Sequence, residues 1–422
     1  MSDALIDDVL RRFRSKDKSE RESAAKELRA AARAGTLSIS SAERLILAAR
    51  ESFPSDQNEP FPISCQLLVA AREISKDGNA DRLLSALQTV FGVLTPDGRR
   101  LALQIVCQMQ DLAAVRFYVN CLREHGGTLG HGIPEFSPAA GVEVARVLLP
   151  ALLSLARDPA VAWPVFHTLL EFRNEGLAEA DLLEPHEYSI AEVLGTEVER
   201  VLATQQATGI GWRYASPYLM HREMVGLLFD LAGAYDAPRL REVVRASDGL
   251  SDPRLRRFRA VALLRHNETA MAMELEWIAR NPADRYWLFG QLCQFGLAEH
   301  LPESCHDQTL LAEGHLSDWL CYPTELGREP DEIELIHVES RPASQTRTPI
   351  NWLRKRKLVD YFFFKYRVTE EHWSKKNGWM VGMAGGYQRD KQPTVAHDGG
   401  TFSRFTKHES KSIAEHVAEY LE

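Results

Sequence analysis

The sequence predicts a mainly α-helical protein in which a long array of paired helices precedes a small α+β domain. Its 422 residues exceed the roughly 250–300 that one compact core usually accommodates. Up to about position 315, apolar residues recur with helical spacing and strand-like alternation is absent. At Glu332 the apolar period changes to the two-residue alternation of a β-strand. We therefore expect a helical array over residues 1–315 and an α+β domain over residues 316–422.

The first helices are indicated by capping signals. An S-x-x-E capping box, Ser19 to Glu22, precedes an apolar stripe, and Gly35 ends that helix. A second box, Ser40 to Glu43, opens the next helix. Further apolar segments of helical period follow, each ended by glycine, proline or Asn/Asp turn residues. They lie near residues 65–74, 80–91, 97–109, 112–122, 142–156, 161–172 and 188–202.

The clearest repeat-like unit covers residues 219–264. In its last helix Ser251 or Asp252 supplies the N-cap and Pro253 occupies the first turn. A unit of two helices cannot bury its own apolar stripe, so neighbouring units must lie against one another. This predicts an α-helical solenoid, and an ordinary helical bundle is the alternative.

The same unit resembles the second half of a HEAT repeat, because Asp-Pro is followed by arginines and then by Ala and Leu at helical spacing. The resemblance to HEAT and armadillo arrays covers roughly residues 1–315, with irregular repeat lengths. It implies an extended helical surface of the kind that binds other macromolecules.

The C-terminal segment predicts a three-stranded antiparallel sheet covered by one helix. The expected strands are 332–339, 359–368 and 379–384, rich in β-branched and aromatic residues, and the expected helix is 410–421. The stretches 318–335 and 378–385 resemble the C-terminal segment of bacterial HEAT-repeat-containing proteins, a family without an assigned activity. That resemblance implies a bacterial cytoplasm and no catalytic residue.

Composition narrows the expected partners. The formal net charge of −9 is carried entirely by residues 1–317, which disfavours nucleic acid and favours a basic protein partner. No secretory signal and no run of apolar residues long enough to span a bilayer is evident. Six widely separated cysteines without a C-x-x-C pair indicate a reducing compartment, so we expect a cytoplasmic protein.

The most distinctive candidate site is the turn that precedes the sheet, together with aromatic residues of the small domain. Residues 323–332 are rich in proline and carboxylates, which is typical of a rigid turn or of a recognition pocket. Aromatic clusters near long loops are used for protein binding as well as for core packing. The candidate partner-binding residues are Trp319, Glu325, Arg328, Asp331, Glu332, Trp352, Trp373 and Tyr387.

The sequence contains no pattern that indicates a cofactor or a metal ion. Glycines 378–386 match no phosphate-binding loop and are better explained by crowding in a twisted strand. The basic run 354–357 could prevent the following strand from pairing with the edge of another sheet, or it could contact phosphate groups.

These observations favour a non-enzymatic scaffold or adaptor, for example an immunity-type protein that neutralises a toxin. One alternative is an enzyme that uses Glu325, Asp331 and either His337 or His372 at the junction of array and sheet. Another is a HEAT-like protein that binds nucleic acid. A groove lined by exposed aromatic and acidic residues would favour binding, and a closed pocket with strongly shifted pKa values would favour catalysis. The oligomeric state is not indicated.

Overall fold

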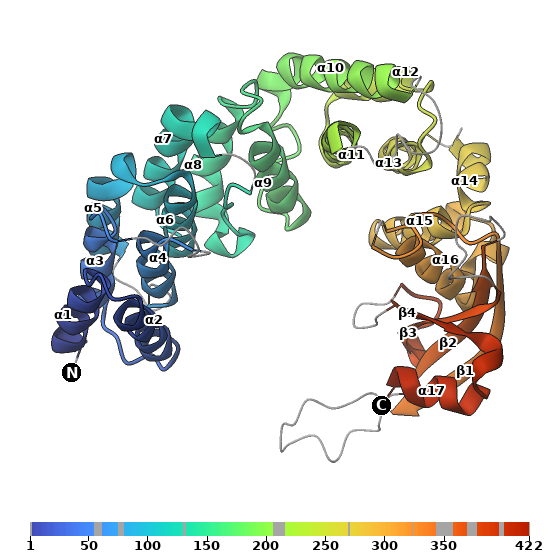
Figure 1. Cartoon of the computed structure of the whole chain (residues 1–422). Coiled ribbons are helices and arrows are strands. Elements are labelled where there is room, and N and C mark those ends of the chain that lie inside the picture. The colour runs from blue at the N-terminus through green and yellow to red at the C-terminus, as the bar shows by residue number, and fades with distance from the viewer. Residues whose placement is uncertain are drawn as a thin grey trace. The chain divides into compact units, whose positions relative to one another are not determined.

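The structure is a computed structural model that describes most of the chain (Figure 1). The described residues are 2–54, 61–74, 80–129, 132–205, 216–268, 271–322, 324–342, 358–368, 378–395 and 401–421. Over these ranges the protein is mainly helical, as predicted, with one antiparallel sheet near its C-terminus. Contacts divide the chain into two compact units. Unit 1 contains Met1–Glu199 and Ala234–Val243, and unit 2 contains Arg200–Gly233 and Val244–Glu422.

The helices of the first part of the chain are short and closely spaced. They are α1 (Ser2–Phe13), α2 (Lys18–Arg33), α3 (Ile39–Ala48), α4 (Ile63–Ile74), α5 (Ala80–Val90), α6 (Pro96–Met109), α7 (Leu112–Leu129), α8 (Gly141–Leu153), α9 (Ala162–Asn174), α10 (Glu187–Gln205), α11 (Ser216–Ala234) and α12 (Pro238–Ala246).

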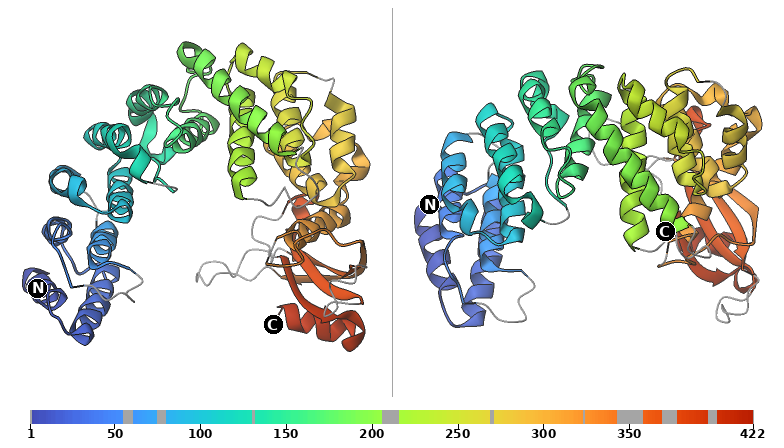
Figure 2. Two further views of the ribbon diagram at one scale, coloured as in Figure 1. Left: turned by 45° about the horizontal axis from the view of Figure 1, so that its top comes forward. Right: turned by 90° about the horizontal axis from the view of Figure 1, so that it is seen from above.

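The packing in unit 1 follows the order of the chain. Helix α1 contacts α2 and α3, α2 contacts α4, α3 contacts α4 and α5, and α4 contacts α6. Helices α1, α3, α5 and α7 thus form one row and α2, α4 and α6 form a second, as Figure 2 shows. Each apolar stripe is buried by neighbouring helices, which is the arrangement that short amphipathic helices require.

Two of the three predicted helix starts are displaced. Helix α2 begins at Lys18, where Asp17 is the N-cap and its carboxylate accepts a hydrogen bond from the Ser19 amide at 2.8 Å. Helix α3 has Ser38 as its N-cap in a box with Ser41. Both predicted boxes were therefore wrong by two residues, because several capping side chains stand close together in the sequence.

The predicted start of α13 is confirmed. Asp252 is the N-cap, its carboxylate accepts a hydrogen bond from the Arg254 amide, and Pro253 stands in the first turn. Some of the remaining helices of unit 2 also begin at a capping side chain, and others do not. The helices from α13 onward are α13 (Pro253–Leu264), α14 (Ala272–Ala279), α15 (Pro282–Gln294), α16 (Gln308–Leu320) and α17 (Ile413–Leu421).

Helices α15 and α16 approach each other closely because Gly314 lies at their contact. A Cβ atom at Gly314 would overlap the carbonyl oxygen of Pro282 and come within 2.9 Å of the Tyr286 Cβ. The predicted domain boundary at 315/316 lies inside α16, whose residues join the helical packing to the sheet.

The sheet has four strands and not the three that the sequence predicts. The strands are β1 (Glu332–Pro342), β2 (Leu358–Arg367), β3 (Met380–Gln388) and β4 (Thr401–Lys407). They lie in the order β1-β2-β3-β4 and pair antiparallel throughout. The prediction missed β4 because it is a short, largely polar edge strand whose pairing with β3 shifts register near Met380.

Two helices cover the two faces of the sheet (Figure 1). Phe362, Phe364 and Tyr366 of β2 pack with α16, and Phe363 packs with α17. Successive side chains of a strand point to opposite faces, so one aromatic run supplies both cores. Gly382 of β3 lies against the Leu316 side chain, where a Cβ would come within 2.9 Å, so crowding accounts for this glycine as predicted.

Candidate binding groove

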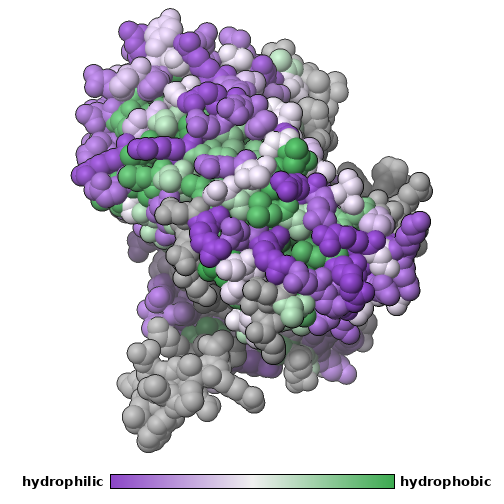
Figure 3. All heavy atoms as spheres, turned by 90° about the vertical axis from the view of Figure 1, so that its left-hand side faces the viewer, coloured by the Kyte–Doolittle hydropathy of each residue, from purple (hydrophilic) through white to green (hydrophobic). Residues whose placement is uncertain are grey.

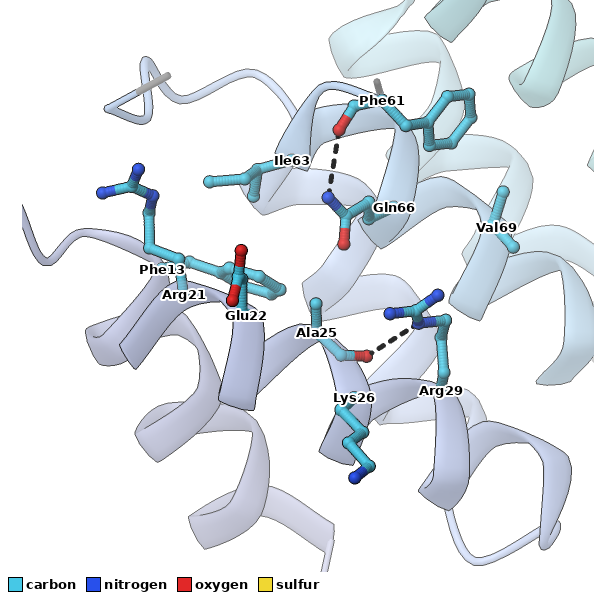
Figure 4. Close-up of a pocket in the computed structure, with 10 residues that line it drawn as sticks. All are labelled: Phe13, Arg21, Glu22, Ala25, Lys26, Arg29, Phe61, Ile63, Gln66 and Val69. Atoms are coloured by element: carbon cyan, nitrogen blue, oxygen red, sulfur yellow. Dashed lines mark hydrogen bonds between the residues drawn. The ribbon is translucent and has the colours of Figure 1, made fainter. Parts of the chain in front are cut away.

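A groove with a volume of about 570 Å³ opens between α2 and α4 in unit 1 (Figure 4). Its size lies within the range of sites that bind small molecules or short segments of a partner. One wall comes from α2, and the other from α4 and the residues just before it. The lining residues are Phe13, Arg21, Glu22, Ala25, Lys26, Arg29, Phe61, Ile63, Gln66 and Val69.

The floor of the groove is apolar. Phe13, Ala25 and Ile63 are buried in unit 1, and Val69 is half-buried. Phe61 stands at the edge of the groove with 37% of its surface exposed. Its position is fixed in part by the Gln66 side-chain amide, which donates a hydrogen bond to the Phe61 carbonyl oxygen at 3.0 Å (Figure 4). The groove therefore offers apolar surface that a ligand would remove from water.

The α2 wall carries three cationic side chains and one carboxylate. Lys26 and Arg29 are exposed, and the Arg29 Nε donates to the Ala25 carbonyl oxygen at 3.2 Å. Arg21 is buried, and its Nη1 donates to the Ser15 and Lys16 carbonyl oxygens. Glu22 is exposed. The local charge of the groove is thus positive although the chain as a whole is acidic.

The lining positions have helical periodicity on both walls. On α2 they run from residue 21 to residue 29, which is about 12 Å along a helix axis. On α4 they run from residue 63 to residue 69, or about 9 Å. The groove is therefore a short trough about two helical turns in length.

Three of the predicted partner-binding residues lie at the start of β1 and form ion pairs there. Arg328 forms an ion pair with Asp331, and Glu332 forms one with Arg367 of β2. Trp319 is half-buried and packs against the core between α16 and the sheet, and Glu325 is half-buried. None of these residues lines the groove.

Tyr387 was predicted to contact a partner, but it is buried in the core of unit 2, so its side chain is not available at the surface. Its hydroxyl lies 2.9 Å from the His315 Nδ1. Trp352 and Trp373 lie outside the described residues, as do His372 and the basic run 354–357.

Two of the residues proposed for a catalytic alternative are paired with neighbouring side chains. Asp331 is paired with Arg328, and the His337 Nε2 lies 3.2 Å from a Glu339 carboxylate oxygen on the same strand. An ion pair at the start of a strand and a pair within one strand are common surface contacts. Neither pair lines a described cavity.

Strongly shifted pKa values occur elsewhere, around a small polar cavity in unit 2. Burial raises the pKa of Asp284 to about 6, although Arg257 and Arg254 oppose this shift. Arg257 is itself buried, and its Nε and Nη1 have no hydrogen-bond partner among the described atoms. The cavity is lined by Arg222, Asp252, Arg254, Ala283, Asp284, Cys321 and Glu329.

This cavity measures about 30 Å³, which is the space of roughly one water molecule. A cavity of this volume is too small for an organic substrate. The ionic network instead joins helices: Arg254 of α13 contacts Asp318 of α16 at 3.0 Å. We interpret it as a structural joint between α13, α15 and α16.

Sequence reasoning missed the groove because its lining comes from three separate helices. One local signal was present: Phe61 is a large apolar residue between Pro60 and Pro62 in an otherwise polar connection. Aromatic residues at a protein surface are frequent contacts for partner proteins.

Other aromatic side chains also reach the surface of their own units. Trp163, Trp277 and Trp287 are between 39% and 43% exposed. The Arg256 guanidinium lies over the Trp277 ring at 4.2 Å. The face drawn in Figure 3 likewise shows apolar residues among hydrophilic ones. Scattered exposure of this kind is ordinary, whereas the groove combines apolar surface with concave shape.

Comparisons of the chain with protein-family models, with curated proteins and with solved structures gave no match. The resemblance to HEAT-repeat proteins thus stays a prediction from the sequence. Among the described helices, none combines the length and apolar character needed to cross a membrane.

Proposed function

We propose that this protein is a non-enzymatic scaffold that binds a protein partner, with the α2–α4 groove as its contact site. In this proposal unit 1 is an α-helical solenoid of the HEAT or armadillo type. The contacts between neighbouring helices of each row support this solenoid arrangement, because stacked repeats contact only their neighbours. Such arrays bind partners on the extended surface that the stacked helices form.

The observation that carries the proposal is the groove itself. It joins an apolar floor to a charged wall, which is the pattern of interfaces that combine buried anchors with a polar rim. Asp284, whose pKa is raised to about 6 by burial, lines a cavity with space for about one water molecule, so this cavity offers no substrate site. Binding therefore fits the described residues better than catalysis does.

Photo-crosslinking in cells tests this proposal. A benzophenone amino acid at Gln66, inside the groove, should form a protein adduct of defined mass. The same amino acid at Gln88, an exposed position on α5 in the other row, should not form that adduct.

A matched pair of substitutions provides the specificity control. Val69→Asp places a carboxylate on the groove floor and should abolish the Gln66 adduct. Val93→Asp makes the same change at a position that is 70% exposed and outside the groove, and it should leave the adduct intact. If the Gln66 position yields no protein adduct, or if both valine variants retain it, the groove is not a protein-binding site.

A further inference from the structure

We infer that the occupant of the α2–α4 groove is an acidic amphipathic helix contributed by the partner. This inference rests on the proposed function and adds the chemistry of the segment that binds. It revises the expectation of a basic partner, which followed from the net charge of the whole array.

The length of the groove favours a helix over an extended segment. The α2 wall presents lining residues over about 12 Å. A helix places side chains i, i+3 or i+4, and i+7 on one face within about 10 Å, so three apolar anchors fit. An extended segment covers the same distance with about four residues and directs only two of them to one face.

The floor determines which side chains the helix presents. Phe13, Ala25 and Ile63 are buried and apolar, and they offer no side-chain hydrogen-bond partner. Val69 and Phe61 extend the same apolar surface toward the rim. Leu, Phe or Met anchors would release water from this surface, whereas phosphate groups or polar side chains would lose hydration without compensation.

The α2 wall determines the charge of the exposed flank. Lys26 and Arg29 are exposed and three residues apart on α2; in Figure 4 the Arg29 guanidinium points toward the groove, whereas the Lys26 ammonium points away from it. Carboxylates on the flank of a bound helix that faces α2 would meet Arg29 directly and would be attracted by Lys26 over a longer distance. A basic flank would be repelled, because Glu22 is the one carboxylate among the described lining residues.

A displayed library of random 13-residue peptides, selected on the full chain, tests this inference. Clones that bind the natural chain but not the Val69→Asp variant are counted as groove-dependent. We expect their consensus to contain apolar residues at i, i+3 or i+4, and i+7, with Asp or Glu on one flank. We also expect their affinity to fall as the salt concentration rises.

Charge reversal supplies the matched control. Lys26→Glu with Arg29→Glu should weaken a selected peptide by at least about 10-fold, since the attraction to Arg29 and Lys26 becomes repulsion. Arg116→Glu with Arg123→Glu makes the same change in charge on α7 of the same unit, outside the groove lining, and should change affinity less than about 3-fold. A peptide in which the acids are replaced by lysine should bind the first variant better than the natural chain.

Three results of the peptide selection and the charge reversals would overturn the inference. One is a groove-dependent consensus that is basic or lacks helical spacing. Another is equal weakening by the two double variants. The third is the absence of groove-dependent clones while dodecanoate binds the natural chain and not the Val69→Asp variant, which would identify a small amphiphile as the occupant. A Gln66 adduct with a basic or extended segment would reject this inference alone, whereas failure to form any protein adduct would reject the proposed function.

Discussion

Replacing Gly314 by alanine should destabilise unit 2, although alanine is normally the better helix former. Helix propensity alone favours alanine by about 1 kcal/mol. At Gly314, however, the added methyl group would overlap the Pro282 carbonyl oxygen and approach the Tyr286 Cβ to 2.9 Å. Since the obstacle is backbone, it cannot rotate away, and α15 and α16 must separate. Overpacking of this kind costs up to about 3 kcal/mol, so we expect a net loss of about 2 kcal/mol.

Gly195 provides the matched control. It lies inside α10, and a Cβ there meets nothing within 4 Å, so Gly195→Ala should stabilise unit 1 by about 0.5–1 kcal/mol. Urea unfolding followed by circular dichroism measures both changes, and hydrogen exchange assigns each change to its helices. If Gly314→Ala proved as stable as the natural chain, the close approach of α15 and α16 would be refuted.

Three further substitutions test buried polar groups. Burial lowers the pKa of His315 to about 4, so the unfolded state binds its proton first as the pH falls below about 6.5. Stability should therefore decline by up to about 3 kcal/mol between pH 6.5 and 4, and urea titrations should show a smaller decline in His315→Gln. Arg257→Met should cost about 3 kcal/mol at pH 8, because it removes the cation that stabilises the buried Asp284 carboxylate more than Arg254 does. The cost should shrink at pH 5, where Asp284 is protonated, and an equal cost at both pH values would contradict this account. Tyr235→Phe removes the hydrogen bond that the hydroxyl donates to the Leu169 carbonyl oxygen at 2.7 Å, so thermal unfolding should show a loss of about 1–2 kcal/mol in unit 1 only.

Short sequence motifs predicted those helices and strands whose ends are set by residues close together in the chain. Asp252 and Pro253 fix the start of α13, because a cap and a first-turn proline act within the helix they begin. Capping was ambiguous near residues 17–22 and 38–43, where several Ser and Asp side chains compete for one role. The strands β2 and β3 were visible in their apolar content, whereas β4 had no such signal because an edge strand buries little.

Sites built from distant parts of the chain were not predictable in the same way. Tyrosine is common at protein-binding surfaces, but the position of Tyr387 in β3 directs its side chain toward α16 and the half-buried His315. The groove depends on how α2 and α4 pack against each other, and the sequence of neither helix alone predicts that packing. Net charge was also misleading locally, because Lys26 and Arg29 lie on one wall of a region that is acidic overall.

The ten residues Ala234–Val243 have a consequence for any attempt to divide this protein. They belong to unit 1, where the Asp236 amide donates to the Ala180 carbonyl oxygen and Arg173 holds the Ala234 carbonyl oxygen. The chain nevertheless reaches them through residues 200–233 and continues from them into the rest of unit 2. Cleaving the polypeptide at one point therefore cannot release two complete halves. A fragment ending at residue 199 would lose buried Tyr235 and Leu240, and the complementary fragment would carry them as exposed, aggregation-prone surface.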